Sequence, residues 1–295
     1  TRGRSGPLSV TSLRDVFENP LSQAFLQACV QAGVPQVDDY NGERYEGVSY
    51  LQLSTERGQR CSSAKAYLST PRPNLTLVTG AVVTGIQLEG RRAAGVTYRV
   101  DGTTHRALAR CEVALAAGPI KSPQLLELSG IGDAGRLQML GISVCHHLPG
   151  VGENLIDHLQ SRLAFECTEP ITLNDIMSSP LRQAWMGMRY LMNRRGPMAT
   201  PSASVHALAR TRTIEDRPDV KIQLHHISGA DRYAKKGYGL DPFPGFSIGF
   251  FQLRPRSRGS VHATSPDPDD APRIDPCYLG HEEDAATMLR ALRLA

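Results

Sequence analysis

The sequence lacks the long apolar segment that a membrane-spanning helix requires. No uninterrupted apolar run approaches 18 residues, and no signal peptide opens the chain. The six cysteines are widely scattered and contain no C-x-x-C pair, which argues against a zinc site or a dense disulfide framework. We therefore predict free thiols in a reducing cytoplasm, and we leave open an attachment to the periphery of the inner membrane.

An excess of charge of one sign is also missing. The 295 residues carry a formal net charge of +4, and their lysines and arginines are dispersed along the chain. The densest basic run is Arg254, Arg256 and Arg258, which is typical of a solvated strand end. Nucleic acid is therefore not an expected partner.

Several catalytic and metal-binding patterns are absent as well. The chain contains no G-x-S-x-G elbow and no H-E-x-x-H motif. The pairs His146-His147 and His225-His226 are adjacent residues, which point to opposite faces of a strand, so neither pair can easily chelate one ion. We predict no metal site. For Asp157-His158 a conformational role is favoured over an acid–base pair.

The segment "GVGENL", residues 150–155, matches only the beginning of a dinucleotide phosphate loop. Leu155 stands where a third glycine or an alanine would be needed, and no acidic residue closes a βαβ unit about twenty residues later. We predict a structural turn there.

What the sequence does contain is a series of strand-like and helix-like runs. Apolar spacing and end signals predict helices in residues 21–33, 133–140, 179–196 and 281–295. Short runs divided by glycine and Asp-Gly turns predict strands in residues 74–79, 82–90, 93–102, 113–117, 219–228, 246–255 and 259–264. This order favours an α/β portion up to about Leu155, followed by a mixed α+β portion.

The run "GPIKSPQLLELSGIG", residues 118–132, is the most informative stretch. Gly118 breaks an apolar strand, Ser122 can cap a helix, and Pro123 suits a first helical turn. A small-residue break after a buried strand lets a large planar cofactor lie against the backbone. An ordinary β–α turn explains the same residues, and physical reasoning alone leaves both interpretations open.

The same run resembles the second signature of the glucose-methanol-choline (GMC) flavoprotein oxidoreductases. The matching positions include Gly118-Pro119, Ser122-Pro123, Leu125-Leu126 and residues 129–132. Further stretches are similar to the same family, namely residues 60–86, 148–158 and 253–279. The resemblance covers essentially the whole chain, and it is greatest to the bacterial alcohol and choline dehydrogenase-like branch.

This resemblance implies part of an FAD-binding Rossmann-like domain, with a second substrate domain built on an antiparallel sheet with helices. It divides the chain into a connecting segment with substrate-side loops (1–60), an FAD-binding portion (61–158) and a truncated substrate domain (159–295). The implied activity is oxidation of the CH–OH group of a small-molecule alcohol by hydride transfer to FAD, with an unknown electron acceptor. Val83, Ala117 and Gly118 fall on the family's flavin-contacting positions.

The resemblance also implies that the chain is an internal fragment. The family's phosphate loop is expected before Thr1 and its catalytic histidine, with a His or Asn partner, after Ala295, so we predict no catalytic residue within the chain. Two other functions remain open: a cyanohydrin lyase on the same scaffold, and a cofactor-free, β-rich binding domain.

Choline-oxidising members of the family carry a glutamate at the position that aligns with Ser204. No Asp or Glu occurs in residues 196–212, although a buried quaternary cation needs a carboxylate or an aromatic cage. We therefore expect an uncharged primary alcohol to be preferred over choline. Ser204→Glu is then expected to shift the preference towards choline.

Overall fold

A computed structural model describes residues 3, 5–229 and 239–295 of the chain. The chain divides into two compact units. The first comprises Thr1–Arg72, His158–Arg254 and Ala285–Ala295, and the second comprises Pro73–Asp157 and Pro255–Asp284. Which of these segments serve flavin or substrate stays a prediction.

The first unit is organised around a five-stranded antiparallel sheet of order β12-β15-β14-β13-β2. Its strands are β12 (Gln160–Glu166), β15 (Gly245–Gln252), β14 (Val220–His225), β13 (Ala203–Ala209) and β2 (Gly47–Tyr50). Side chains alternate between the two faces of each strand, and one face of this sheet is consistently apolar. That face includes Val48, Val205, Ile222 and Phe250.

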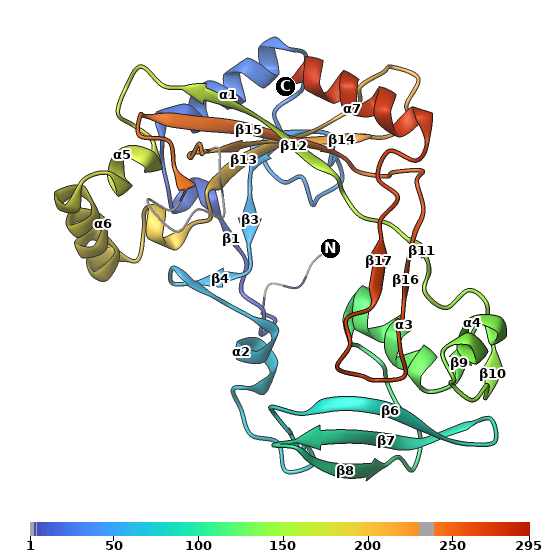
Figure 1. The fold of residues 1–295 in the computed structure, drawn as a ribbon. Helices are drawn as coiled ribbons and strands as arrows, with labels where there is room; N and C mark the ends of the chain where they lie inside the picture. Colours follow the sequence, from blue (N-terminus) through green and yellow to red (C-terminus); the bar gives the residue numbers. More distant parts are fainter. Residues whose placement is uncertain (1–2, 4, 230–238) are drawn as a thin grey trace. The chain divides into compact units, whose positions relative to one another are not determined.

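Two helices cover the apolar face, and Figure 1 shows both lying along it: α1 (Pro20–Gln31) and α7 (Glu282–Leu294). Phe25 and Leu26 of α1 and Ala291 of α7 pack into the core that the strands form. The start of α1 follows directly from its sequence, because Asn19 caps the helix by accepting a hydrogen bond from Leu21 N and Pro20 occupies the first turn. Burial of this apolar surface is what fixes the sheet beneath the helices.

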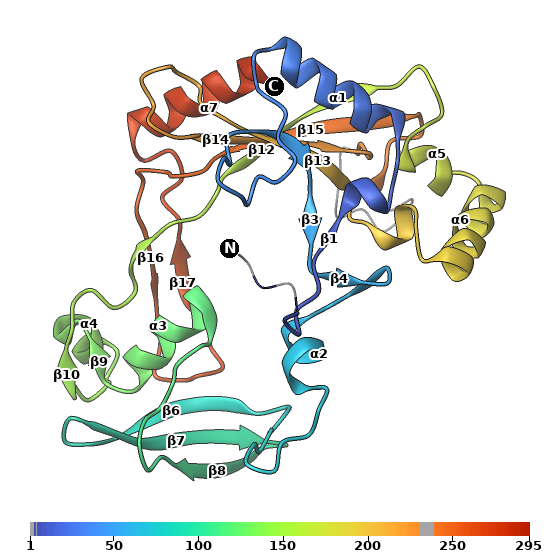
Figure 2. The same ribbon diagram turned by 180° about the vertical axis from the view of Figure 1, so that it is seen from behind.

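The remaining elements of the first unit are short, apart from one helix. They are β1 (Thr11–Ser12), the 3-10 helix η1 (Leu13–Asp15), β3 (Gln52–Leu53), β4 (Thr55–Glu56), β5 (Gln59–Arg60), α2 (Ser63–Leu68), α5 (Leu173–Met177), α6 (Pro180–Asn193) and the 3-10 helix η2 (Pro197–Ala199). Figure 2 shows α6 beside α5, away from α1 and α7.

The second unit combines small sheets with two helices. A three-stranded antiparallel sheet joins β6 (Val82–Glu89), β7 (Arg92–Val100) and β8 (Thr103–Leu108). A second one joins β11 (Glu153–Leu155), β16 (Gly259–His262) and β17 (Arg273–Asp275), and β9 (Ile131–Gly132) pairs in parallel with β10 (His146–His147). The helices are α3 (Gly118–Leu128) and α4 (Ala134–Met139).

The predicted mixture of helices and strands, with an antiparallel sheet carrying helices, is confirmed. Two predicted strands are wrong. Residues 74–79 and 113–117 contain no strand, because among the described residues no neighbouring strand pairs with them. An apolar composition favours extended backbone, but a strand exists only where a partner satisfies its N–H and C=O groups.

The four predicted helices are confirmed as α1, α4, α6 and α7, but the start of α3 differs from the expectation. Ser122 does not cap it: the helix begins four residues earlier at Gly118, with Ala117 as the capping residue and Pro119 in the first turn. Pro123 therefore lies inside the helix, where it removes only the hydrogen bond that would reach back to Pro119. No described helix is long and apolar enough to cross a membrane.

Candidate functional site

The predicted cofactor-side residues Ala117 and Gly118 lie at the beginning of α3, at the surface of the second unit. Gly118 has a φ of +79°, a conformation that side chains with a Cβ rarely adopt. An ideal Cβ built on Gly118 would meet nothing within 4 Å, so the backbone here faces open space. The chain therefore presents a bare stretch of backbone, against which a planar group could lie.

Val83, the third predicted cofactor-side residue, lies on β6 opposite Tyr98 and its side chain is exposed. The structure joins β6 to α3 through Ser129, whose Oγ accepts a hydrogen bond from Ile86 N at 2.8 Å. That link lies at the far end of α3 from Gly118. The two elements are thus neighbours.

A buried ionic cluster holds the other end of α3 in place. Glu127, in the last turn of α3, is fully buried, and its Oε1 lies 2.8 Å from Nδ1 of His262. Its Oε2 accepts a hydrogen bond from Ala263 N at 2.6 Å. The second ring nitrogen of His262 lies 3.0 Å from Glu153 Oε1, on β11. Glu127 and Glu153 thus contact the two ring nitrogens of His262, one on each side of the imidazole.

This cluster explains the turn at residues 150–155. Gly152 has a φ of +81°, and a Cβ there would come within 2.3 Å of Val261 O and 2.6 Å of His262 Nδ1. Gly152 O accepts a hydrogen bond from Val261 N at 2.7 Å. The glycine is needed because β16 approaches closely, which confirms the predicted structural turn rather than a phosphate loop.

The predicted substrate-side residue Ser204 lies in the interior of the first unit. It sits at an irregularity of β13, where the register with β14 shifts between Ala203 and Val205. Its Oγ lies 2.8 Å from Ser22 Oγ on α1 and 2.6 Å from Nε2 of His226. The Ser204 hydroxyl is therefore already engaged by buried partners on the helix side of the sheet.

Sequence reasoning did not find the polar face of the five-stranded sheet, which lies opposite the helices. One row of register partners crosses all five strands on this face: Arg162, Gly249, Gln223, His206 and Ser49. The polar face also carries Gln160, Lys221, His225, Ser247 and Phe251 from the neighbouring rows, and the acidic residue Glu166 at the end of β12. Alternating polar residues in β13 and β14 were the available signal.

Gly249 makes room for hydrogen-bonding groups at the middle of the polar face. A Cβ at Gly249 would lie 2.5 Å from Gln160 Nε2 and 3.1 Å from His225 Nε2. The Gln223 amide nitrogen donates to His225 Nε2 at 2.9 Å, so His225 Nδ1 carries the proton and donates to Ser202 Oγ at 3.2 Å. These two hydrogen bonds fix the tautomer of His225. The side chains of Gln223 and His225 are thereby held in defined orientations on the polar face.

His206 and Ser49 form the most buried part of the polar face. They are register partners on β13 and β2, and both side chains are almost completely buried. Neither ring nitrogen of His206 nor the Oγ of Ser49 has a hydrogen-bond partner among the described residues. Tyr40 packs edge-on against the imidazole, with ring centroids 4.2 Å apart. Burial, and secondarily Lys221, lowers the pKa of His206 to about 3, so its imidazole is neutral.

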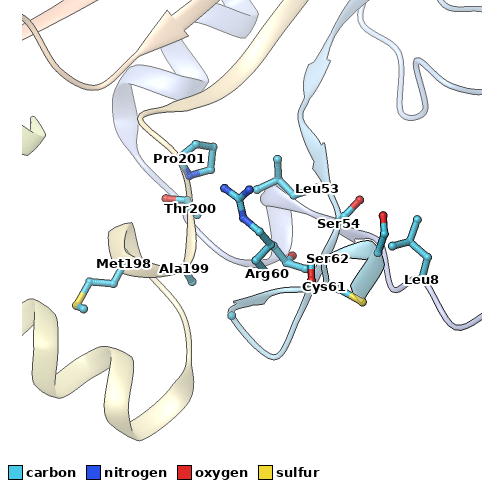
Figure 3. A pocket seen from close by; sticks show the side chains of 13 residues that line it. Leu8, Leu53, Ser54, Arg60, Cys61, Ser62, Met198, Ala199, Thr200 and Pro201 are labelled. Atoms are coloured by element: carbon cyan, nitrogen blue, oxygen red, sulfur yellow. The ribbon is translucent and has the colours of Figure 1, made fainter. Parts of the chain in front are cut away.

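A hollow of about 690 Å³ lies in the first unit, among residues that the sequence interpretation had not singled out. Figure 3 shows Arg60 reaching towards Thr200 and Pro201. Its lining combines apolar side chains with the hydroxyl-bearing residues Ser54, Thr55, Ser62, Ser63 and Thr200. Arg60 makes no side-chain hydrogen bond or ion pair within the described part of the chain. The hollow suits a small molecule that accepts hydrogen bonds, and it disfavours a cation.

The adjacent histidines His225 and His226 were predicted to point to opposite faces. His225 points to the polar face while His226 contacts Ser204 and Phe17, so the adjacent pair does diverge. No group of His, Cys, Asp and Glu in the described residues could hold a metal ion. His158 stacks on Phe251 and Asp157 accepts a hydrogen bond from Tyr278, so each has its own partner.

Comparison with known proteins identifies the family. The N-terminal model of the GMC oxidoreductases matches residues 4–160, more than half of the chain, and the C-terminal model of the same family matches residues 255–295. The chain therefore belongs to the GMC oxidoreductase family. This confirms the resemblance deduced from residues 118–132.

Curated relatives include two enzymes named oxygen-dependent choline dehydrogenase. The one from Photobacterium profundum is 38% identical over 99% of this chain and 51% of its own length, and the one from Brucella ovis is 40% identical over 99% and 52%. The crystal structure of pyridoxine 4-oxidase from Mesorbium loti matches with a TM-score of 0.82 and 26% identity, over 99% of this chain and 53% of that one. The chain thus spans about half the length of the relatives it matches.

Proposed function

We propose that this chain forms part of an FAD-dependent oxidoreductase that acts on the CH–OH group of an alcohol. The observation that carries the proposal is the segment 118–132, which folds as a glycine-led turn and helix with open space beside Gly118. Membership of the GMC oxidoreductase family supports it, and it makes a cofactor-free binding domain the weaker alternative. A lyase on the same scaffold is the remaining alternative.

Val83, Ala117 and Gly118 are the residues of this chain that we propose to contact FAD. They fit a planar group because Gly118 has no Cβ and its surroundings are empty, while Ala117 and Val83 are small and exposed. When bound, FAD would accept the hydride from the carbinol carbon. The part of these residues is to bind and orient the cofactor, and the ionic cluster of Glu127, His262 and Glu153 keeps α3 in the required place.

For the substrate side we propose the polar face of the sheet, with Ser204 as the further candidate from the sequence. Gln223 and His225 present oriented hydrogen-bonding groups of the kind that hold a hydroxyl. The names of the relatives favour choline as substrate. The row of Arg162, Gly249, Gln223, His206 and Ser49 carries no carboxylate, however, and the acidic residue on this face of the strands, Glu166, lies at the end of β12. Burial lowers the pKa of Lys221 on the same face. We therefore favour an uncharged primary alcohol.

We place the protein in the cytoplasm, where the six cysteines, all free in the structure, would stay reduced. An attachment at the periphery of the inner membrane is the finer version of this proposal.

The deciding experiment is anaerobic reduction of bound flavin in a protein of full family length that contains these residues. We expect bleaching of the flavin absorbance when benzyl alcohol or a medium-chain alcohol is added. An unchanged spectrum with every alcohol, together with cleavage of a cyanohydrin, would favour the lyase instead.

A further inference from the structure

Helix α6 turns a continuous apolar stripe to the solvent. At 100° per residue, Leu181, Trp185, Met188 and Met192 fall within a narrow sector of the helix. Their exposed fractions are 84%, 63%, 51% and 77% respectively, and Leu191 beside them is 71% exposed. A large apolar cluster of this kind on a surface marks an interaction site.

The opposite side of α6 fastens the helix to the first unit. Gln183, Met186, Gly187 and Tyr190 lie there and are less exposed. The Gln183 amide donates to Met177 O at 2.7 Å, and the Tyr190 hydroxyl donates to Gly58 O at 3.1 Å. The apolar stripe is therefore held outwards by the fold, and Figure 2 shows α6 at the outside of its unit.

Positive charge accompanies the stripe. Between Asp175 and Glu215 the sequence contains six arginines and no acidic residue. Of these, Arg182, Arg189 and Arg195 form no ion pair within the described ranges, although Arg189 and Arg195 share a hollow with Asp15 and Glu18. Basic residues flanking a Leu/Trp/Met stripe are typical of helices that lie in the interface of an anionic membrane.

We propose that α6 docks this protein onto a membrane surface that contains anionic lipids, with the stripe of Leu181, Trp185, Met188 and Met192 entering the headgroup region. A helix of 14 residues is about 21 Å long and lies along the surface rather than across it. A second copy fits less well, because a symmetric contact would bring these arginines against one another. A partner protein that encloses the helix in a groove fits less well too, because one side of α6 already packs against the first unit.

The chain carries its own reporter, since Trp185 is its single tryptophan. Vesicles of phosphatidylcholine containing phosphatidylglycerol should shift the fluorescence emission of Trp185 in the full chain to shorter wavelength. They should also protect this fluorescence from quenching by acrylamide. Lipids brominated along the acyl chain should quench it. Pure phosphatidylcholine should act far more weakly, and raising the salt from about 0.1 M to about 1 M should release the protein, because the screening length falls from about 10 Å to about 3 Å.

Variants separate the contribution of the arginine charges to membrane binding from that of the apolar stripe. Arg182→Gln and Arg189→Gln should each weaken binding to anionic vesicles roughly fivefold, the worth of one arginine near such a surface. Leu181→Ser with Met192→Ser should weaken it on both vesicle types. The matched control is Arg106→Gln with Leu108→Ser, an exposed pair on β8 that should change nothing.

Equal binding by the α6 variants and the parent overturns the proposal, as does the absence of any emission shift with anionic vesicles. A third outcome also overturns it: a dimer in sedimentation equilibrium whose Trp185 is shielded before lipid is added would assign the stripe to a second copy.

Discussion

The hydroxyl of Ser204 lies 2.6 Å from Nε2 of His226, and neither side chain is exposed to solvent. Ser22 completes the group from α1, with its Oγ 3.2 Å from the same ring nitrogen. The imidazole thus links the first helix to β13 and to the end of β14. Burial lowers the pKa of His226 to about 4, so the group is held together by a neutral ring.

Buried neutral histidines predict a loss of stability in acid. In the unfolded chain a histidine has a pKa of about 6.5, but in the folded protein burial lowers the pKa of His226 to about 4 and that of His206 to about 3. As the pH falls below 6.5, both histidines become protonated in the unfolded chain but stay neutral in the folded protein. The free energy of unfolding therefore decreases. For His226 the decrease amounts to roughly 3 kcal/mol by pH 4. Urea unfolding between pH 7.5 and pH 4.5 measures it.

A variant checks the assignment. His206→Gln should lower the stability at neutral pH but flatten its dependence on acid, because one of the two titrating groups is gone. An unchanged slope in this variant would mean that the acid sensitivity arises elsewhere, since carboxylates lose their own contribution only at lower pH.

The Glu127–His262 pair predicts a strongly non-additive mutant cycle. His262→Ala leaves the buried Glu127 carboxylate with Ala263 N as its remaining partner, and should cost about 3–5 kcal/mol. The double variant Glu127→Gln/His262→Ala should recover part of that loss, because no unpaired charge remains in the interior. Thermal unfolding of the four proteins gives the coupling energy.

The exposed pair Glu89–Arg92 serves as the control for this cycle, at 3.5 Å between Arg92 Nη1 and Glu89 Oε2. Its coupling should stay below about 1 kcal/mol, as for other surface ion pairs. If the losses of stability in the Glu127 and His262 single variants simply add up in the double variant, an ionic link between the two residues is contradicted.

Local signals predicted the helices of this chain better than its strands. The residues Asn19-Pro20 and Ser179-Pro180 mark helix starts within a few positions, so α1 and α6 could be read directly from the sequence. The strands in 74–79 and 113–117 failed because pairing depends on distant segments. The residues of a short segment do not indicate whether a distant strand is available to pair with it.

The candidate site was predictable to a similar extent. The family motif located Gly118, because its glycine is tied to local backbone geometry. The polar face was missed, since it arises when β2, β13 and β14 from separate parts of the chain fall into one register. Burial of Ser204 could not be foreseen either, because its partners Ser22 and His226 are remote in sequence.

Gly118→Val should remove flavin binding without a matching loss of stability. The protein leaves the space beside Gly118 open, so the substitution costs only the backbone strain of a side chain at φ +79°, about 1–2 kcal/mol. Gly141→Val is the matched control, because Gly141 has a φ of +72° and equally empty surroundings. In a protein of full family length, flavin retained after gel filtration should fall for Gly118→Val and persist for Gly141→Val. Equal retention in both variants would make Gly118 a structural turn only.

The 295 residues taken alone should retain FAD weakly or not at all, because they contain no complete dinucleotide fingerprint. The measurement is the flavin absorbance of the purified chain after incubation with FAD and desalting. Stoichiometric yellow flavin, or dye reduction with an alcohol, would show that the residues present suffice.

The choice between choline and an uncharged alcohol can be tested on the polar face. Gln223 lies there beside His225 and is half-buried, and its row of register partners has no carboxylate to receive a quaternary ammonium group. In a protein of full family length, we expect kcat/KM for benzyl alcohol or a medium-chain alcohol to exceed that for choline. Gln223→Glu should then raise the choline-to-benzyl-alcohol ratio by about tenfold, equivalent to about 1.4 kcal/mol.

Two comparisons make this last result specific. Ser204→Glu, the substitution that the family alignment suggests, would place a carboxylate in the buried group with Ser22 and His226, so we expect it to lower the melting temperature. Gln138→Glu adds the same charge to an exposed position of α4 and should leave the ratio unchanged. A parent enzyme that already prefers choline would refute the expected preference. A ratio that responds to Ser204→Glu but not to Gln223→Glu would place the substrate on the other side of the sheet.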